Sequence, residues 1–366
     1  MGNASAYATE KKPVANNEII HRTLGKTGIQ LPVVNLGRVL NEKMITMALE
    51  GGMTLIDTGY IYWDGKHEEM LGELLKDRPR DSFYLATKVD HRREPLTVDS
   101  FIKQFETSLH RLKLDYVDIL HLHGASSRED TLNDTYLTAL TKMRKQGKAR
   151  FLGLSTHSNQ PEVIRAAIES KIYDVVLTSY NFRLDNLRDN TDAIAEANHA
   201  GLGIIAMKTM AGAYWDKEGK DPINTKAALK FVLQNENIHT TIPGVRAFHE
   251  LEDNFEVNKD ISMTTEEIQD LRLEQAKSGL FCFGCDNCKT QCSNNMPISD
   301  IMRSYMYAYG YKDLSQARST LDSLNLPDNI CSRCDSCSVK CVQGFDVAEK
   351  IKDIDRLRNV PSDFIT

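Results

Sequence analysis

Eight short apolar runs, each followed by helical sequence, constrain the fold of this chain most strongly. The runs lie at 33–37, 53–58, 83–88, 117–123, 149–155, 174–179, 203–208 and 239–244. Continuous apolar runs of this length are typical of strands buried on both faces of a parallel sheet. Their regular alternation with helices predicts an α/β fold, a (β/α)8 TIM barrel, rather than an open sheet. No G-x-G-x-x-G follows the first run, which disfavours a Rossmann domain.

The segments between the runs have the spacing of amphipathic helices. Within 100–112, four apolar residues fall on one helical stripe: Phe101, Phe105, Leu109 and Leu112. A further helix is predicted to begin at Thr264, because Glu267 stands three residues later and completes a capping box.

Charge and hydropathy exclude two kinds of partner. The net charge of -6 over 366 residues, without a clustered basic stripe, argues against nucleic-acid binding. No apolar run reaches the roughly 18 residues that a membrane span needs. Residues 1–17 have no apolar core and indicate the polar tail of a cytoplasmic protein. Their small residues at 4–8 leave the trimmed remnant of an export signal as the alternative.

Polar residues stand where three predicted strands end. Asp57 closes the second run, Lys88 the third and His123 the fourth. In a barrel the chemistry lies at the C-terminal ends of the strands. Buried charges there are costly unless they pair with one another. We therefore expect these three side chains to form a site.

Together with Tyr62, these residues resemble the aldo-keto reductase family. The matching segments are 22–32, 55–75, 85–89, 108–124, 153–158, 204–212 and 242–254. As in the family motif, Asp57 and Tyr62 stand five residues apart, and His123 follows Asp118 by five. The resemblance implies that the chain reduces an aldehyde or ketone, or oxidises the alcohol, with Tyr62 as general acid/base assisted by Lys88, Asp57 and His123.

The chemistry of the four residues agrees with that role. Carbonyl reduction leaves an alkoxide that must receive a proton, and a free tyrosine has a pKa of about 10. The Lys88 ammonium favours the phenolate and is expected to lower the pKa of Tyr62. Asp57 would hold Lys88 charged, and His123 would polarise the carbonyl oxygen.

Two neighbouring residues compete for these roles. His121 lies two residues before His123, and Tyr60 two residues before Tyr62. Either histidine suits a satisfied core position as well as a catalytic one. The choice of His123 and Tyr62 rests on spacing.

The resemblance also implies a nicotinamide cofactor, NADP(H) as the family default or NAD(H). The implied contacts are Ser155 and Thr156 to the carboxamide, Met207 to the ring, Lys208 to the pyrophosphate, and Gly244, Arg246 and Asn254 to the adenosine end. The chain departs from the family pattern at Thr156, at Leu177 in place of a glutamine, and at Glu250, which aligns with a basic position. Glu250 keeps NAD(H) open.

All eight cysteines lie in the last quarter, in two C-x2-C-x2-C-x3-C runs. The repeated run is that of ferredoxins and predicts two [4Fe–4S] clusters. Because the fourth cysteine of such a run binds the other cluster, we expect two crossed sets: Cys282, Cys285, Cys288 and Cys341; and Cys331, Cys334, Cys337 and Cys292. A pair of zinc sites or a disulfide framework are the alternatives.

The expected organisation is a flexible tail at 1–17, the barrel at 18–275 and a 4Fe–4S dicluster domain at 276–366. Helical patterns at 298–309 and 314–324 resemble those of α-helical ferredoxin domains. The domain begins where many family members place the loop that closes the substrate pocket, so we expect part of it to wall that pocket.

Two functions remain in competition. The first is a reductase of a small carbonyl compound, in which an external electron carrier is a further candidate partner of the clusters. The second is an electron-transfer or redox-sensing iron–sulfur protein whose barrel binds nicotinamide as a regulatory ligand. Three aromatic residues are candidates to line a pocket for a hydroxylated substrate such as a sugar: Trp63, Tyr214 and Trp215.

Overall fold

A curled parallel sheet forms the centre of the molecule. The computed structural model describes residues 18–92, 95–272, 280–282, 284–328, 330–331, 334 and 336–365. The predicted tail at 1–17 and the predicted boundary between 275 and 276 lie outside these residues. The strands pair in chain order, all parallel: β3 (Leu55–Asp57), β4 (Tyr84–Asp90), β5 (Val117–His123), β6 (Ala149–Thr156), β7 (Val175–Ser179), β8 (Gly203–Met207) and β9 (Thr240–Thr241).

The first predicted strand, 33–37, closes this sheet without forming a regular strand. Leu36 bridges to Ile56 of β3, and Val34 bridges to Thr241 of β9. The ladder is short because the side chain of Asn35 accepts hydrogen bonds from the backbone N–H of Thr54, at 2.9 Å, and of Leu55, at 2.8 Å. The predicted barrel is therefore confirmed as a closed, barrel-like fold, with seven regular strands instead of eight.

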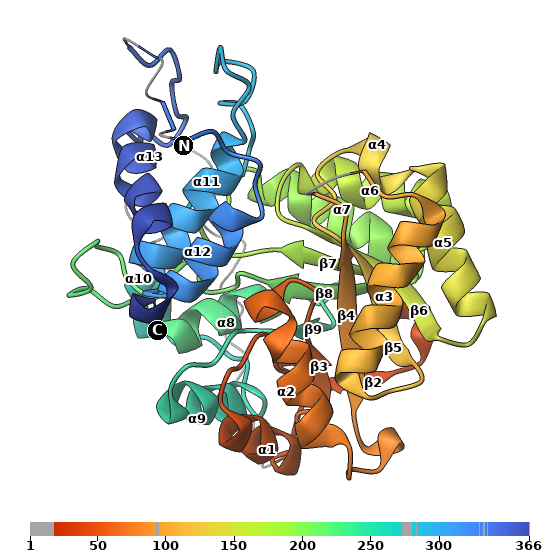
Figure 1. Cartoon of the computed structure of the whole chain (residues 1–366). Helices are drawn as coiled ribbons and strands as arrows, with labels where there is room; N and C mark the ends of the chain where they lie inside the picture. The colour runs from red at the N-terminus through yellow and green to blue at the C-terminus, as the bar shows by residue number, and fades with distance from the viewer. Residues whose placement is uncertain are drawn as a thin grey trace.

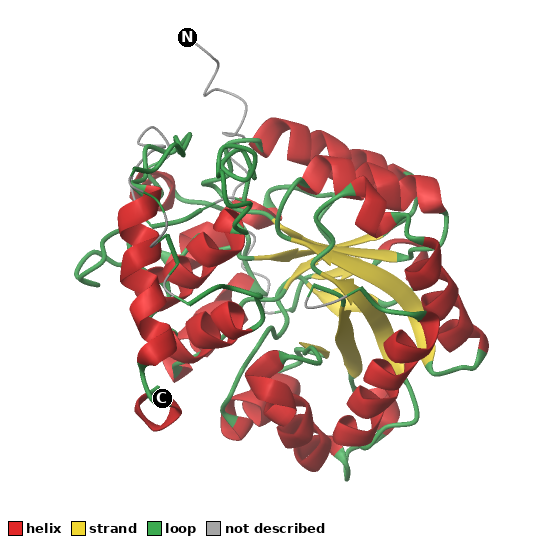
Figure 2. Ribbon diagram, turned by 45° about the horizontal axis from the view of Figure 1, so that its top comes forward, coloured by secondary structure: helices red, strands yellow, loops and turns green. Residues whose placement is uncertain are grey.

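An antiparallel hairpin precedes the barrel in the chain, and helices surround the barrel sheet (Figures 1 and 2). The hairpin consists of β1 (His21–Thr23) and β2 (Gln30–Pro32). The helices are α1 (Glu42–Glu50), α2 (Lys66–Leu75), α3 (Val98–Leu112), α4 (Arg128–Thr131), α5 (Asp134–Lys145), α6 (Gln160–Ser170), α7 (Leu187–His199), α8 (Thr225–Leu233), α9 (Phe248–Val257) and α10 (Thr265–Asp270). As predicted, α3 buries its four-residue apolar stripe, and α10 starts at a capping box of Thr264 and Glu267.

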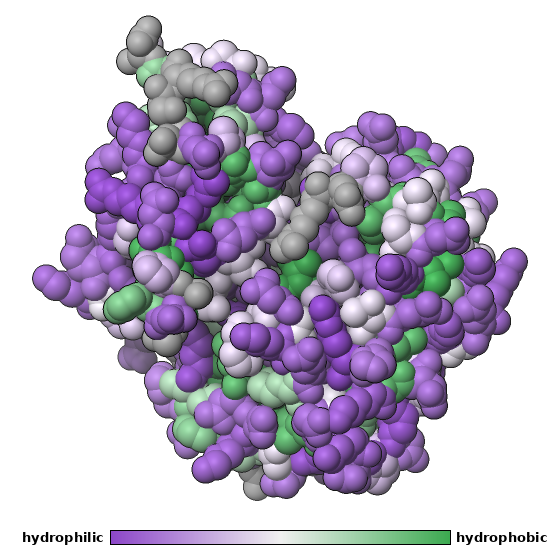
Figure 3. Space-filling view, in the orientation of Figure 1, coloured by the Kyte–Doolittle hydropathy of each residue, from purple (hydrophilic) through white to green (hydrophobic). Residues whose placement is uncertain are grey.

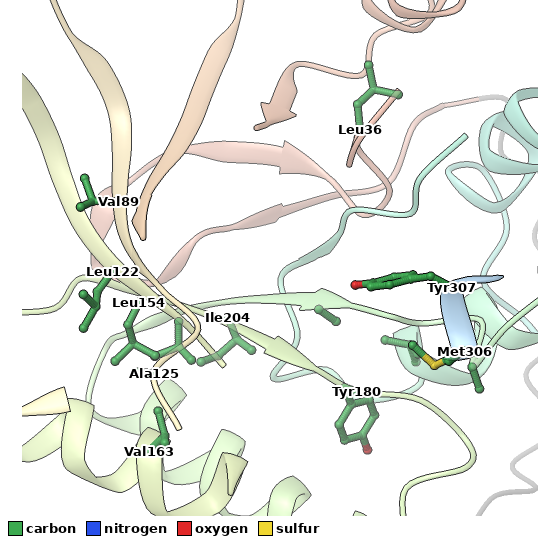
Figure 4. Close-up of a cluster of buried hydrophobic side chains, with 14 of the residues drawn as sticks. Leu36, Val89, Leu122, Ala125, Leu154, Val163, Tyr180, Ile204, Met306 and Tyr307 are labelled. Atoms are coloured by element: carbon green, nitrogen blue, oxygen red, sulfur yellow. The ribbon is translucent and has the colours of Figure 1, made fainter. Parts of the chain in front are cut away.

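The C-terminal segment is mainly helical and packs against one side of the barrel (Figure 1). It contains α11 (Ile298–Tyr305), which continues as a π-helical turn η5 (Met306–Gly310), then α12 (Leu314–Asp322) and α13 (Val347–Asp355). Figure 4 shows Met306 and Tyr307 of this segment beside barrel residues of one continuous apolar core. Ion pairs tie the two parts together, Arg38 with Asp313 and Lys217 with Asp353.

The molecular face seen in Figure 3 is mostly hydrophilic. Within the described part of the chain, no helix combines the length and the apolar character needed to cross a bilayer.

Candidate active site

Three of the four predicted catalytic residues point into the barrel at the C-terminal ends of its strands. Side chains alternate along a strand, so those of Asp57 on β3, Lys88 on β4 and His123 on β5 share the inner face with core residues such as Leu55 and Ile119. The parallel register pairs Lys88 with His121 and Asp90 with His123. Each polar side chain thus comes from a neighbouring strand end.

Tyr62 reaches the same place from the loop after β3. This loop contains η3 (Tyr62–Gly65), in which Trp63 and Asp64 take left-handed backbone angles, with φ of 52° and 51°. The Tyr62 ring lies 5.9 Å from the His123 ring, edge to face. The Lys88 Nζ lies 4.6 Å from the centre of the Tyr62 ring. The structure therefore brings all four predicted residues together.

Lys88 is buried and donates to two acceptors of the barrel. Its Nζ donates to Asp57 Oδ2 at 2.5 Å and to the Thr58 carbonyl at 2.5 Å. Burial lowers the pKa of Lys88, but Asp57 and Tyr62 outweigh burial, so the pKa rises overall and the lysine stays charged. Burial raises the pKa of Asp57, and Lys88 acts against this rise.

The net effect on Tyr62 differs from the expectation. Burial raises the pKa of Tyr62 more than the Lys88 ammonium lowers it, and Asp57 and Tyr307 add to the rise. Tyr62 is therefore a neutral phenol near neutral pH, which is the form that can donate a proton. Lys88 does lower the pKa of Tyr62, as predicted, but this contribution is smaller than the rise caused by burial, so the net shift is upward.

The two competing neighbours lie elsewhere. His121 is one layer deeper in the barrel, against Gly153, where an added Cβ would approach its Nδ1 to 2.3 Å. Neither ring nitrogen of His121 has a hydrogen-bond partner among the described residues. The ring of Tyr60 lies under the Arg111 guanidinium at 4.7 Å, and Tyr60 does not line the cavity above the strands.

His123 does line that cavity, and it is neutral. Burial lowers the pKa of His123 well below its usual value, and the charges of Arg92 and Lys88 lower it further. Its Nδ1 is buried and has no hydrogen-bond partner among the described residues. A neutral imidazole here can donate a hydrogen bond to a carbonyl oxygen while keeping its own proton.

A cavity of about 440 Å³ opens above the four residues. The barrel contributes one wall, and α11, η5, the following turn and α12 contribute the other, as expected for the C-terminal segment. The residues from that segment are Arg303, Tyr307, Tyr311, Lys312, Asp313, Leu314, Ser315, Gln316, Thr320 and Ser323. Trp63, Tyr214 and Trp215 are not part of the lining, so the expected aromatic platform is not formed there.

Four of the seven implied cofactor contacts line this cavity: Met207, Lys208, Gly244 and Arg246. Ser155 and Thr156 are buried beside it with their hydroxyls engaged. Ser155 Oγ accepts from the Gly124 N–H at 2.9 Å, and Thr156 Oγ1 donates to the Ser158 carbonyl at 2.8 Å. Asn254 lies on α9, and its buried Nδ2 has no hydrogen-bond partner among the described residues.

Among the polar cavity residues that the sequence reasoning missed are Arg92, His157, Arg303 and Tyr307. Arg92 and His157 each stand just beyond a strand end, at the same level as the predicted tetrad, and this position is a usable signal. Arg303 and Tyr307 come from a distant helical segment, and nothing local in the sequence places them here. The Lys208 Nζ lies 4.2 Å from the centre of the Tyr307 ring.

The eight cysteines gather in two crossed sets. One cavity is lined by Cys282, Cys285, Cys288 and Cys341, and another by Cys292, Cys331, Cys334 and Cys337. Each set thus takes three members from one run and one from the other. No cysteine of the described residues forms a disulfide, so a disulfide framework is not present. Searching the described residues for three or more His, Cys, Asp or Glu that could hold a metal ion gives no such group.

Hydrogen bonds connect the two cysteine runs. Gln291 Oε1 accepts from the Lys340 N–H at 2.7 Å, and Ser338 Oγ donates to the Gln291 carbonyl at 2.7 Å. Burial raises the pKa of Cys282 to about 12. The first run also touches the barrel: a Cβ on Gly284 would lie 2.8 Å from the His157 carbonyl.

Sequence comparisons identify relatives of the barrel. The model of the Aldo/keto reductase family matches residues 38–226. L-galactose dehydrogenase of Arabidopsis thaliana is 26% identical over 281 residues, which cover 64% of this chain and 86% of that protein. The uncharacterized oxidoreductase YqkF of Bacillus subtilis (strain 168) is 24% identical over 295 residues, which cover 69% of this chain and 95% of that protein.

Solved structures agree on the fold. The holo form of the aldo-keto reductase AKR11C1 from Bacillus halodurans superposes with a TM-score of 0.60 at 22% identity, covering 71% of this chain and 97% of that one. A putative aldo-keto reductase from Pseudomonas aeruginosa gives a TM-score of 0.56 at 23% identity, covering 66% of this chain and 96% of its own. These neighbours are matched nearly whole, while part of this chain has no counterpart in them.

Proposed function

Since the chain belongs to the aldo/keto reductase family and is an oxidoreductase, we propose that it reduces an aldehyde or ketone with NADP(H) or NAD(H), or runs the reverse oxidation. The observation that carries this proposal is that Asp57, Tyr62 and His123 line one cavity. Lys88 is buried against Asp57 and the Tyr62 ring. A nicotinamide sensor has no need of a buried lysine held by an aspartate beneath a tyrosine, so the tetrad favours turnover over sensing.

The cavity suits a nicotinamide dinucleotide. When bound, the cofactor supplies the hydride. Lys208 and Arg246 line the cavity and provide cationic groups for its phosphates. Met207 offers an apolar surface for the ring. The buried Asn254 Nδ2 has no hydrogen-bond partner among the described residues, but Asn254 is not part of the cavity lining. Glu250, which prompted the question of NAD(H), accepts from the Arg246 N–H at 2.6 Å and thus caps α9.

In this mechanism the chain positions and moves one proton. Neutral Tyr62 donates its phenolic proton to the oxygen of the reduced carbonyl. Lys88 stabilises the phenolate that remains, and Asp57 keeps Lys88 charged and in place. His123, neutral and exposed to the cavity, donates a hydrogen bond to the same oxygen. In the reverse direction Tyr62 takes the proton back from the alcohol.

We further propose that the two cysteine sets each bind a [4Fe–4S] cluster, the first through Cys282, Cys285, Cys288 and Cys341, the second through Cys331, Cys334, Cys337 and Cys292. The support is the crossed grouping around two cavities, which matches the ligand pattern of two-cluster ferredoxins. A four-iron cube binds each cysteine at a different iron and so holds its ligands farther apart than a single ion does. Cysteines that suit a cube therefore need not form a site for one ion.

The two sets differ in exposure, which bears on partners. Cys334 and Cys337 are exposed, whereas Cys282, Cys285 and Cys288 are partly covered. A cluster in the second set would face solvent, where an external electron carrier has access. We propose such a carrier as the partner for any electrons that leave the molecule.

An anaerobic mixing experiment tests the proposed function. Cluster-replete protein is mixed with NADPH, or with NADH, and a simple aldehyde is then added. Nicotinamide absorbance, cluster absorbance and EPR are followed together. We expect the aldehyde to drive oxidation of the nicotinamide while the clusters keep their oxidation state. Reduction of the clusters by the nicotinamide alone, without any effect of the aldehyde, would contradict carbonyl reduction as the function.

A further inference from the structure

Two arginines that the catalytic tetrad does not need flank the reacting end of the cavity. Arg92 follows β4, and Arg303 lies on α11 of the C-terminal segment. Together with His157 they line both the catalytic cavity and a neighbouring polar cavity of about 490 Å³. They therefore stand at the junction of the two spaces, next to Tyr62 and His123.

Arg92 is held in a fixed direction. Its Nε donates to Asp90 Oδ1 at 2.7 Å, and its Nη2 donates to Asp90 Oδ2 at 3.3 Å. The side chain crosses Gly124, where a Cβ would come within 2.9 Å of the Arg92 Cδ. Gly124 also has a positive φ of 74°, so both its backbone and its missing side chain make room for Arg92. No described residue provides an acceptor for the Arg92 Nη1.

Arg303 is similarly placed from the opposite wall. Its Nη2 pairs with Asp300 Oδ1 at 2.9 Å, and only 11% of its side chain is exposed. Its Nε and Nη1 have no acceptor among the described residues. A guanidinium offers five N–H donors in one plane, and a carboxylate accepts two of them side by side. Both arginines thus keep donors available for a ligand.

The charges around this junction do not cancel within the cavity. Two acidic residues line the cavity, and each is already paired, Asp57 with Lys88 and Asp313 with Arg38. The partners of the two arginines, Asp90 and Asp300, are outside the catalytic lining. Each arginine is nevertheless paired with its aspartate, and Asp300 lines the neighbouring cavity, so an anion at the junction would be bound mainly by the guanidinium N–H donors that these pairs leave open.

The cofactor does not account for these arginines. The cations that suit its phosphates, Lys208 and Arg246, follow β8 and β9, although the Lys208 Nζ also lies 4.2 Å from the centre of the Tyr307 ring, one helical turn after Arg303. Arg92 lies in the connection that follows β4, the strand that carries Lys88, and that precedes β5, the strand that carries His123. The strand order therefore separates Arg92 from the cations that suit the cofactor.

We infer that the carbonyl substrate carries a carboxylate, which Arg92 and Arg303 bind while Tyr62 and His123 face the carbonyl group. This inference rests on the proposed carbonyl reduction and names its substrate class. It also gives the C-terminal segment a direct part in specificity, because Arg303 belongs to that segment.

Two aldehydes of nearly the same shape test the inference: 4-carboxybenzaldehyde and its methyl ester, methyl 4-formylbenzoate. We expect kcat/KM of the cluster-replete enzyme to favour the carboxylate by about tenfold or more. Arg303→Met and Arg92→Met each lower kcat/KM for the carboxylate by about tenfold to a hundredfold, and that for the ester by less. Arg303→Lys restores part of the preference. Arg356→Met is the matched control, because Arg356 lies in the same segment with 82% of its side chain exposed.

Equal kcat/KM values for the two aldehydes, or a preference that survives both substitutions, would overturn the inference and leave carbonyl reduction intact. If neither aldehyde is reduced, carbonyl reduction itself fails, and binding decides the inference. Calorimetric titration with 4-(hydroxymethyl)benzoate in the presence of NADP+ then gives binding that Arg303→Met weakens at least tenfold. Absence of binding to the unsubstituted protein overturns the inference.

Discussion

The barrel site and the cysteine sets differ in what holds their polar side chains in place. In the barrel, the chain supplies the partners of the buried charges: Lys88 has Asp57 and the Thr58 carbonyl. The cysteine side chains are partly or fully exposed, and Asn294 Nδ2 donates to Cys334 Sγ at 3.1 Å. The comparison teaches that the protein alone holds the residues of the barrel site in place, whereas under our proposal the cysteine region is held by its clusters.

The two regions nevertheless meet in one cavity. Gly284 of the first cysteine run packs on the His157 backbone, and Arg303 and Tyr307 face the tetrad from the segment between the runs. Loss of a cluster is therefore expected to disturb substrate binding before it disturbs the tetrad.

The largest effect expected is on iron content, and it sharpens the difference between the regions. Cys282→Ser/Cys341→Ser removes two ligands of one proposed set and should lose about half of the iron. Cys282→Ser/Cys292→Ser removes two ligands from one run, hence one from each set, and should lose nearly all of it. Iron and sulfide analysis of anaerobically purified protein distinguishes the two. The reverse pattern, with nearly all of the iron lost from Cys282→Ser/Cys341→Ser and about half from Cys282→Ser/Cys292→Ser, would show that the sets are not crossed.

The next effect concerns the stability of the barrel. Lys88→Met leaves Asp57 buried without its partner and should lower the free energy of unfolding by about 3–5 kcal/mol. The double variant Asp57→Leu/Lys88→Met removes both charges and should recover most of that loss. Denaturant unfolding of the cluster-replete proteins measures both values. A single variant as stable as the parent would mean that Asp57 is not held by Lys88.

A smaller effect is expected from pH. Burial lowers the pKa of His67 to about 4 and that of His121 to about 3, from 6.5. Below pH 6.5 these two histidines bind protons in the unfolded chain but stay neutral in the folded barrel. Stability therefore falls as the pH drops from 6.5 toward 4, by about 1.4 kcal/mol per pH unit for each histidine. His121→Leu should reduce the slope by about one proton, and an unchanged slope would contradict the assignment.

The smallest effect tests the contact between the two regions. Gly284 and Gly344 both have positive φ, 66° and 75°, so alanine at either position costs about 1 kcal/mol. An added Cβ at Gly284 meets the barrel, whereas one at Gly344 meets nothing within 4 Å. Gly284→Ala should therefore destabilise more than Gly344→Ala in thermal unfolding. Equal losses would show that the first run does not press on the barrel.

Much of the barrel could be predicted because its signals are local. Buried parallel strands read as continuous apolar runs, and Asp57, Lys88 and His123 each close such a run. The bridge at 33–37 was less predictable, since the side chain of Asn35 replaces ladder hydrogen bonds there. The net pKa of Tyr62 depends on burial by the opposite wall, and Arg303 reaches the cavity from a segment far along the chain. Such contacts join segments that are far apart in the sequence, so no periodic pattern of residues indicates them.

The pair Tyr62→Phe and Tyr60→Phe tests the central claim most directly. Both substitutions remove one hydroxyl from the same loop, but only Tyr62 lines the cavity. In single-turnover reduction of a simple aldehyde by bound NADPH, Tyr62→Phe should slow the reaction by about 10²–10⁴-fold and retain cofactor binding, while Tyr60→Phe should react as the parent does. Equal rates in the two variants would contradict Tyr62 as the proton donor, and with it the assignment of this cavity as the site of carbonyl reduction.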